Sequence, residues 1–128
     1  MCGFLSVISL SPIGDSLLDA FTDASHLIKH RGPDDTHHYF SENYISIFHR
    51  LVIRDLTKDS RQPIESKCGR YILSFNGEIY NFIDIPDPIY RSFPSDTLCL
   101  LDQLSTKGIS SINNLIGMFA ISLLDKKK

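Results

Sequence analysis

The alternation of apolar and polar residues divides the first part of the chain into a strand and a helix. Residues 4–10 are dense in apolar and β-branched side chains, which is typical of a buried strand. Apolar residues then recur at helical spacing, which predicts a helix from about Ile13 to Lys29 with Ser11-Pro12 as its start signal. We expect this helix to end at His30-Arg31-Gly32-Pro33, because glycine and proline do not continue a helix.

The middle of the chain alternates between short strands and turns. Strands are predicted at His37–Phe40 and Tyr44–Leu51, joined by the turn-prone Ser41-Glu42-Asn43. A third predicted strand, Tyr71–Phe75, leads directly into Asn76-Gly77, and this dipeptide favours a two-residue hairpin turn.

Two irregular segments and a second helix precede the last predicted strand. Residues 54–62 are polar and residues 82–94 contain three prolines, so we expect loops at both places. A helix should begin at Ser95-Asp96 and end at Lys107-Gly108, and Met118–Leu124 should form the final strand. Because strands and helices alternate irregularly, the pattern predicts an α+β fold in a single domain over residues 1–128.

Composition narrows the classes of protein further. The 128 residues are 42% hydrophobic and 22% charged with a net charge of −2, which favours an ordinary globular protein and gives no reason to expect nucleic acid or a membrane as partner. Three cysteines without a CxxC spacing fit a reducing compartment, so we expect a cytoplasmic protein. Cys68 and Cys99 have no spacing partner and are expected to be buried or half-buried.

Cys2 is the first candidate for chemistry. Removal of Met1 would make it the N-terminal residue and place a thiol and a free α-amine on the same residue. An α-amine has a pKa near 8 in model peptides, so it is partly neutral at cytosolic pH and can take the thiol proton. The position of Cys2 does not by itself distinguish a catalytic cysteine from one without a function.

The other candidates each have a functional and an ordinary interpretation. The Asn76 side-chain amide and the Gly77 N–H could converge on one oxyanion, although Asn-Gly is also a hairpin signal. Arg50 could hold a substrate carboxylate through two parallel hydrogen bonds, or it could form a surface salt bridge. Asp96 could pair with a substrate ammonium group, or it could offset the dipole of the helix that it begins.

The histidines are the natural candidates for a metal site. His26 and His30 stand four residues apart on the predicted helix, and a histidine pair follows at 37–38. There is no HExxH motif, and the neighbouring Asp34 and Asp35 fall in a predicted turn, where aspartate is favoured without any metal. We therefore expect no metal.

Seven short motifs follow one another along the chain, and together they resemble the motifs of a known family. They are Met1-Cys2-Gly3-Phe4, His30-Arg31-Gly32-Pro33-Asp34-Asp35, His49-Arg50-Leu51, Gln62-Pro63-Ile64, Asn76-Gly77-Glu78-Ile79-Tyr80-Asn81, Ser95-Asp96-Thr97 and Gly117-Met118-Phe119-Ala120. The series resembles the class II, N-terminal-nucleophile glutamine amidotransferase domain of glutamine-hydrolysing asparagine synthetases, over nearly the whole chain. The resemblance implies an αββα sandwich of antiparallel sheets.

The same resemblance implies a role for each matching residue. Cys2 would attack the side-chain amide of L-glutamine and form a thioester, and Asn76 and Gly77 would form the oxyanion hole. Arg50 would hold the substrate α-carboxylate, and Glu78 and Asp96 would lie near its α-ammonium group. Backbone groups of the adjoining segment would line the same pocket: Leu51, Val52, Ile53 and Arg54.

Departures from the family pattern qualify these expectations. The family's domain is roughly half as long again, so we expect an incomplete sandwich with an open sheet edge. The ATP-using synthetase domain has no counterpart here, so ATP and magnesium are expected only in a separate synthetase domain or chain, with no cofactor in this one. Leu98 replaces a common glutamate at the helix start, which would lose one capping bond. The alternative function is a non-catalytic remnant or glutamine-binding module, and a homodimer is a further arrangement left open.

Overall fold

The computed structural model describes residues 2–52, 61–82 and 93–127. In chain order its elements are β1 (Gly3–Ile8), α1 (Asp15–His26), the 3-10 helix η1 (Lys29–Arg31), β2 (Asp35–Phe40), β3 (Tyr44–Arg50), β4 (Ile64–Glu65), β5 (Tyr71–Ile79), α2 (Asp96–Lys107), the 3-10 helix η4 (Ile109–Asn114) and β6 (Gly117–Asp125). Within these ranges, neither α-helix has the length and apolar character needed to cross a membrane.

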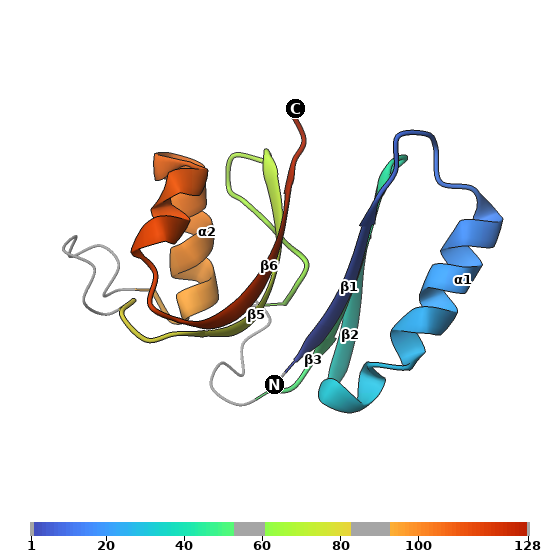
Figure 1. The fold of residues 1–128 in the computed structure, drawn as a ribbon, viewed down its shortest axis with the longest axis horizontal. Helices are drawn as coiled ribbons and strands as arrows, with labels where there is room; N and C mark the ends of the chain where they lie inside the picture. The colour runs from blue at the N-terminus through green and yellow to red at the C-terminus, as the bar shows by residue number, and fades with distance from the viewer. Residues whose placement is uncertain (1, 53–60, 83–92, 128) are drawn as a thin grey trace.

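The strands form two antiparallel sheets of three strands each (Figure 1). The first has the order β1-β3-β2, and the second has the order β4-β5-β6. In the first sheet Gly3 pairs with His49, so the residue before β1 lies beside the end of β3. In the second sheet β6 pairs with β5 along its whole length, with Gly77 opposite Phe119. The predicted α+β class is confirmed, and the sheets are antiparallel as expected.

Helix α1 covers the outer face of the first sheet. Phe21 of the helix packs against Ile45 and Ile47 of β3, with Leu18 beside them. Residues at alternate positions of a strand face opposite sides, so the even-numbered residues of β3 point away from α1 and toward the second sheet. Every residue of β3 is buried, because β3 is the central strand and is covered on both faces.

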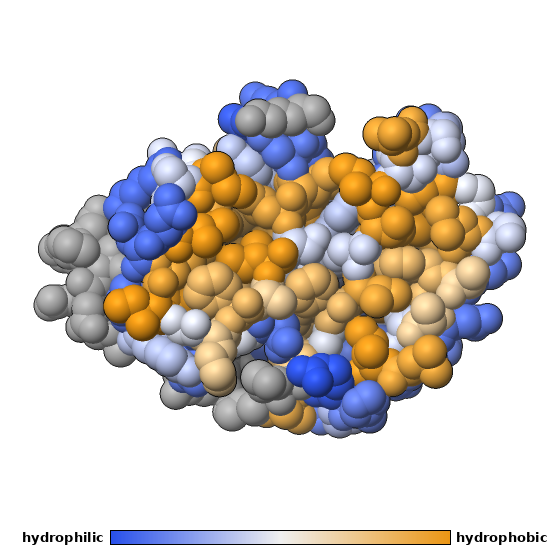
Figure 2. All heavy atoms as spheres, viewed as in Figure 1, coloured by the Kyte–Doolittle hydropathy of each residue, from blue (hydrophilic) through white to orange (hydrophobic). Residues whose placement is uncertain are grey.

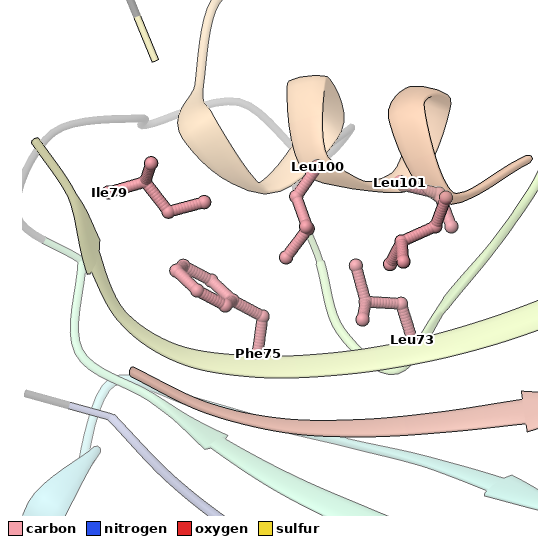
Figure 3. Close-up of a cluster of buried hydrophobic side chains, with 6 residues drawn as sticks. Leu73, Phe75, Ile79, Leu100 and Leu101 are labelled. Carbon is pink, nitrogen blue, oxygen red and sulfur yellow. The ribbon is translucent and has the colours of Figure 1, made fainter. Parts of the chain in front are cut away.

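Helix α2 covers the outer face of the second sheet. Figure 3 shows Leu100 and Leu101 of α2 directed at Leu73, Phe75 and Ile79 of β5, and all five belong to one buried apolar cluster. The helix begins and ends where the sequence predicts. The Ser95 hydroxyl accepts a hydrogen bond from the amide of Leu98 at 3.3 Å, and Gly108 terminates the helix. Such an N-cap bond stabilises a helix by about 1 kcal/mol.

A line of hydroxyl groups joins the two sheets between their inner faces. Ser46 Oγ of β3 lies 2.8 Å from Ser6 Oγ of β1 and 2.8 Å from Ser74 Oγ of β5. The Tyr44 hydroxyl lies 2.9 Å from Ser122 Oγ of β6. Ser46 and Ser74 have no exposed surface, and their mutual bonds offset the cost of burying hydroxyl groups. Because hydrogen bonds are directional, this hydroxyl line fixes which residues of the two sheets face each other.

Several local predictions differ from the structure, among them Asp35, which was expected in a turn and is the first residue of β2. The first helix is shorter than expected: Gly14 is its N-cap and Leu27 its C-cap, so Ser11-Pro12 precedes the helix without starting it. Cys68 is exposed, whereas Cys99 is buried as expected. The short strand β4 has no signal in the sequence pattern. The loop predicted at residues 54–62 and the proline-containing segment at 82–94 lie largely outside the described residues.

The Asn-Gly dipeptide does not form the hairpin turn that its sequence favours. A type I′ turn needs positive φ at both central residues, and no described residue other than glycine has positive φ. Asn76 and Gly77 instead lie inside β5, which continues to Ile79 because β6 supplies a nine-residue partner strand. Long-range pairing therefore overrides the local turn signal.

Strands β1 and β6 are each one of the two edge strands of their sheets, and they share one face of the molecule (Figure 1). Figure 2 shows apolar side chains gathered over that face. Met118, near the start of β6, is 64% exposed, and the preceding Ile116 is 63% exposed. An apolar surface that carries two strand edges is a combination that promotes association between chains.

His49 of β3 links its own strand to helix α1 and to strand β2. Its ring is buried, with Nε2 2.9 Å from the carbonyl oxygen of Ser25 in α1 and Nδ1 2.9 Å from the Thr36 hydroxyl in β2. A carbonyl only accepts, so Nε2 carries the proton of the neutral ring and Nδ1 accepts from the threonine. Burial lowers the pKa of His49, and the bond to Ser25 opposes this shift only in part.

We therefore predict that acid weakens the fold through His49. The folded-state pKa lies below the unfolded value of about 6.5, so below that pH the unfolded chain binds the extra proton and the free energy of unfolding falls. The loss cannot exceed about 1.4 kcal/mol per pH unit for one group. Urea unfolding at about pH 7.5 and about pH 5.5 measures it. The His49→Gln variant should show a smaller pH dependence, and an unchanged dependence would contradict the assignment.

Candidate active site

The thiol of Cys2 lies against the backbone of Leu51, the first residue after β3. The Leu51 amide donates to Cys2 Sγ at 3.3 Å, and the thiol donates to the Leu51 carbonyl oxygen at 3.6 Å. Cys2 is half-buried and lies beside Arg50, one position beyond the Gly3–His49 pair. The sulfur is thus held in a defined position at the end of the first sheet.

The segment between η1 and β2 packs under this thiol. Arg31 Nε donates to the carbonyl oxygen of Cys2 at 3.2 Å. Gly32 follows, and a Cβ atom at that position would lie 2.1 Å from the carbonyl oxygen of His49, so only glycine lets the segment approach β3 this closely. In this segment Arg31 is therefore held by its contact to Cys2, and Gly32 is required by the close approach to β3.

Arg50 is buried at the end of β3 with 8% of its surface exposed. It lies four residues after Ser46, whose hydroxyl contacts the second sheet, so strand alternation places Arg50 on the same inner face. A guanidinium group there is sheltered from bulk water, which strengthens its attraction for a carboxylate.

Asn76 and Gly77 lie on β5, opposite the first sheet. Asn76 is two residues beyond Ser74, so it also lies on the inner face, and it is half-buried. Gly77 has φ of +151°, and a Cβ atom there would lie 2.1 Å from the carbonyl oxygen of Met118 and 2.5 Å from Phe119 Cα. Any side chain at position 77 would push β6 away, which explains the glycine without reference to a turn.

Asp96 connects the start of α2 to the end of β5. One carboxylate oxygen accepts from the amide of Ile79 at 3.1 Å, and the other accepts from the amide of Thr97 at 2.8 Å. Glu78 lies next to Ile79 and shares the inner face of β5 with Asn76. Two carboxylates therefore lie near the same end of β5, where they could attract a cationic group.

The predicted site residues come from both sheets and lie at one end of the sandwich. In Figure 1 the start of β1 and the end of β5 both lie toward the lower side, and β1 contacts β5 across the two sheets. The structure describes eight of the predicted residues at this end: Cys2, Arg50, Leu51, Val52, Asn76, Gly77, Glu78 and Asp96. Ile53 and Arg54 lie outside the described residues.

Two residues near the thiol were not predicted to belong to the site. Arg31 contacts the backbone of Cys2, and the carboxylate of Asp34 accepts from the amide of Val52 at 2.8 Å. Asp34 was expected only as a turn residue. The Arg-Gly-Pro-Asp motif was visible in the sequence, but nothing in its spacing indicated which backbone groups it would bind.

The thiol of Cys2 lies at the start of the first sheet, and Asn76 and Gly77 lie on β5 of the second sheet. The family model for the glutamine amidotransferase domain matches residues 1–128, and the chain belongs to that family.

Within the family, the chain is similar to glutamine-hydrolysing asparagine synthetases. It is 31% identical over 136 residues to asparagine synthetase [glutamine-hydrolyzing] 2 of Bacillus subtilis, covering 100% of this chain and 18% of the relative. It is 32% identical over 132 residues to asparagine synthetase B of Escherichia coli, covering 100% of this chain and 24% of the relative. Amidase chry2 of Gibberella zeae is 31% identical over 143 residues, with 100% and 21% covered. The chain thus spans about a fifth to a quarter of these relatives.

Proposed function

We propose that this chain hydrolyses the side-chain amide of L-glutamine to give glutamate and ammonia, with Cys2 as the nucleophile. The observation that carries the proposal is the thiol itself, fixed by both backbone groups of Leu51 next to the buried Arg50. Membership of the glutamine amidotransferase family supplies the substrate class. The two sheets with a helix on each outer face are in keeping with an N-terminal-nucleophile sandwich.

The proposed reaction uses the α-amine that Cys2 gains when Met1 is removed. The amine takes the thiol proton, and the sulfur attacks the amide carbon of glutamine. The resulting oxyanion accepts hydrogen bonds from the Asn76 side-chain amide and the Gly77 N–H. The ammonium then returns its proton to the departing nitrogen, so ammonia leaves and a γ-glutamyl thioester forms. Water attacks the thioester, and glutamate leaves as the thiol regains its proton.

Substrate recognition in this proposal rests on charge. Arg50 holds the α-carboxylate with two parallel hydrogen bonds, and Glu78 and Asp96 attract the α-ammonium group. Backbone groups of residues 51–54 complete the contacts. Because the α-carbon of glutamine does not react, these contacts set binding more than the chemical step.

The Arg50→Lys variant should therefore raise KM. Lysine keeps the charge but loses the bidentate geometry, and loss of a charged hydrogen bond costs about 1.5–3 kcal/mol, equivalent to a rise in KM of about 10- to 100-fold. Steady-state kinetics measure this, with kcat expected to change much less. Arg70→Lys is the matched control, because Arg70 pairs with Asp125 at the start of β5, the end of that strand opposite to Glu78. An unchanged KM in Arg50→Lys would remove the carboxylate-binding role.

The test of the function itself is a product assay. Purified chain, shown by intact mass to lack Met1, is incubated with L-glutamine, and glutamate and ammonia are measured together. The proposal predicts equal amounts of the two products. A chain that has lost Met1, is folded and releases neither product would overturn it, and binding of glutamine without release would identify a binding module.

The ammonia has a proposed destination. We infer that a separate ATP-dependent synthetase domain or chain uses it to amidate aspartate, with ATP and magnesium bound there. Support comes from the similarity to asparagine synthetases and from their much greater length. The hydrolysis proposed for this chain uses its own side chains, the α-amine of Cys2, the Gly77 N–H and water.

A further inference from the structure

Asp34 binds the backbone on both sides of Leu51, the residue that contacts the Cys2 thiol. The Asp34 amide donates to the carbonyl oxygen of Arg50 at 3.1 Å. Its carboxylate oxygen Oδ2 accepts from the amide of Val52 at 2.8 Å. Leu51 lies between these two bonds in sequence, and its own amide and carbonyl are the groups that face Cys2 Sγ.

The planarity of the peptide bond links these four contacts in pairs. The Arg50 carbonyl and the Leu51 amide belong to one rigid peptide unit, and in a trans unit they point in opposite directions. The Leu51 carbonyl and the Val52 amide belong to the next unit and are opposed in the same way. In each of the two peptide units, one polar group contacts Cys2 Sγ and the opposite group is bound by Asp34.

Beyond the end of β3, side chains rather than neighbouring strands bind the backbone of residues 51 and 52. Leu51 follows the last residue of the central strand β3, which pairs with β1 on one side and with β2 on the other. Beyond Arg50, the thiol of Cys2 continues the hydrogen bonds on the β1 side, and the carboxylate of Asp34 continues them on the β2 side. Without that carboxylate the unit between Leu51 and Val52 would have no partner on the β2 side among these contacts.

We propose that Asp34 is a positioning residue for the nucleophile, acting through the two peptide units around Leu51. This inference rests on the proposed function of Cys2, but it concerns a residue that does not touch the substrate. Its carboxylate keeps the Leu51 carbonyl and amide in place, and these keep the sulfur aligned for attack. Misplacing an attacking atom by about 1 Å costs up to about 100-fold in rate.

Asp35 offers a matched control in the next residue. Its carboxylate is paired with His37 at 2.9 Å and with Arg61 at 3.1 Å. It also accepts from the amide of Thr36 at 3.0 Å, so these three partners of its carboxylate lie outside the segment 50–52 that contacts the thiol. Asp34 and Asp35 are thus neighbours in the sequence, but only the carboxylate of Asp34 binds the backbone next to Leu51.

The experiment compares Asp34→Ala, Asp34→Asn and Asp35→Ala in the full chain. Glutamine hydrolysis gives kcat and KM, and alkylation by iodoacetamide, followed by peptide mass spectrometry, gives the rate at each cysteine separately. Asp34→Ala should lower kcat by about 10- to 100-fold with KM changed by less than about threefold. It should also slow Cys2 alkylation, because the amide that favours the reactive thiolate is no longer fixed.

The conservative variant distinguishes positioning from charge. Asparagine keeps an oxygen that accepts from Val52, so Asp34→Asn should restore kcat and Cys2 alkylation to within about threefold of the wild type. Asp35→Ala should leave both unchanged. Buried Cys99 reports folding in each variant, since its alkylation stays slow only while α2 remains packed. If Asp34→Ala exposes Cys99, Asp34→Glu replaces it, because it keeps the charge and shifts the carboxylate by one methylene.

The outcomes separate the two proposals. Wild-type kcat and Cys2 alkylation in a folded Asp34→Ala or Asp34→Glu variant would overturn the role of Asp34, as would an equal loss in Asp35→Ala. If the wild-type chain releases no glutamate, the proposed function fails. In that case the rate of Cys2 alkylation in Asp34→Ala, compared with that in the wild type, still decides whether Asp34 positions the thiol.

Discussion

Cys2→Ala should abolish glutamine hydrolysis, with glutamate release falling by more than about 1,000-fold. The substitution removes the sulfur that Leu51 holds and leaves the backbone contacts of β1 in place, since Arg31 binds the carbonyl of residue 2 rather than its side chain. The loss should therefore appear in kcat, with the free energy of unfolding lowered by only about 1 kcal/mol through the lost contacts to Leu51. A discontinuous glutamate assay on both proteins, each shown by mass to lack Met1, measures it.

Cys68→Ala is the control for this prediction. Cys68 is the exposed thiol of the chain, and its hydrogen bond with Ser66 lowers its pKa, so it is the cysteine most able to imitate a nucleophile. We expect full activity in Cys68→Ala. Loss of activity there, or retention of it in Cys2→Ala, would move the nucleophile away from the N-terminus.

Asn76→Ala should lower kcat for glutamine hydrolysis by about 100- to 1,000-fold while KM stays nearly constant. The side-chain amide of Asn76 is proposed to bind the oxyanion, which exists in the transition state and not in bound glutamine. Removing it should therefore raise the barrier without weakening binding. A rise in KM with unchanged kcat would instead assign Asn76 to binding of the substrate ground state.

Asn76→Asp provides the sharper comparison. It keeps the size and the position on β5 but replaces the donor with a negative group facing the developing oxyanion, so kcat should fall further than in the alanine variant. The pairing of β5 with β6 does not involve this side chain, and Gly77 keeps the close approach of the strands in both variants. Unfolding measurements should therefore give similar stabilities for the two proteins.

The parts of the fold that depend on nearby residues were predictable from the sequence. Helix α2 begins after Ser95 and ends at Gly108 because its capping residues adjoin it in the chain. The hairpin of β2 and β3 follows from alternation on both sides of a short polar turn. In each case the deciding interactions span a few residues, which is the range over which patterns of residue types are informative.

Where distant residues decide, the sequence was a poor guide. The turn signal of Asn76-Gly77 was overridden by pairing with a strand some forty residues further on, about which the dipeptide carries no information. Ser46 and Ser74 were indistinguishable from ordinary strand serines until the two sheets faced each other. For the same reason Asp34 could not be assigned: its partner Val52 is brought to it by the sheet, not by spacing.

In the candidate site, too, some features were predictable from the sequence and others depended on distant residues. Cys2 was identified from its position and the chemistry of an N-terminal amine, and the ordered motifs suggested its partners. That its sulfur would be bound by both backbone groups of Leu51 could not be predicted, because this contact needs β1 and β3 to pair in the observed register.

The most direct test of the central claim is covalent labelling with a glutamine analogue that carries a diazoketone in place of the side-chain amide. A thiol that attacks this position of glutamine is alkylated by the analogue, so the label marks the nucleophile. We predict one adduct per chain on the peptide that begins with Cys2, slowed by added L-glutamine and absent in Cys2→Ala. Labelling of Cys68 instead, or no labelling of a folded chain that lacks Met1, would contradict the account.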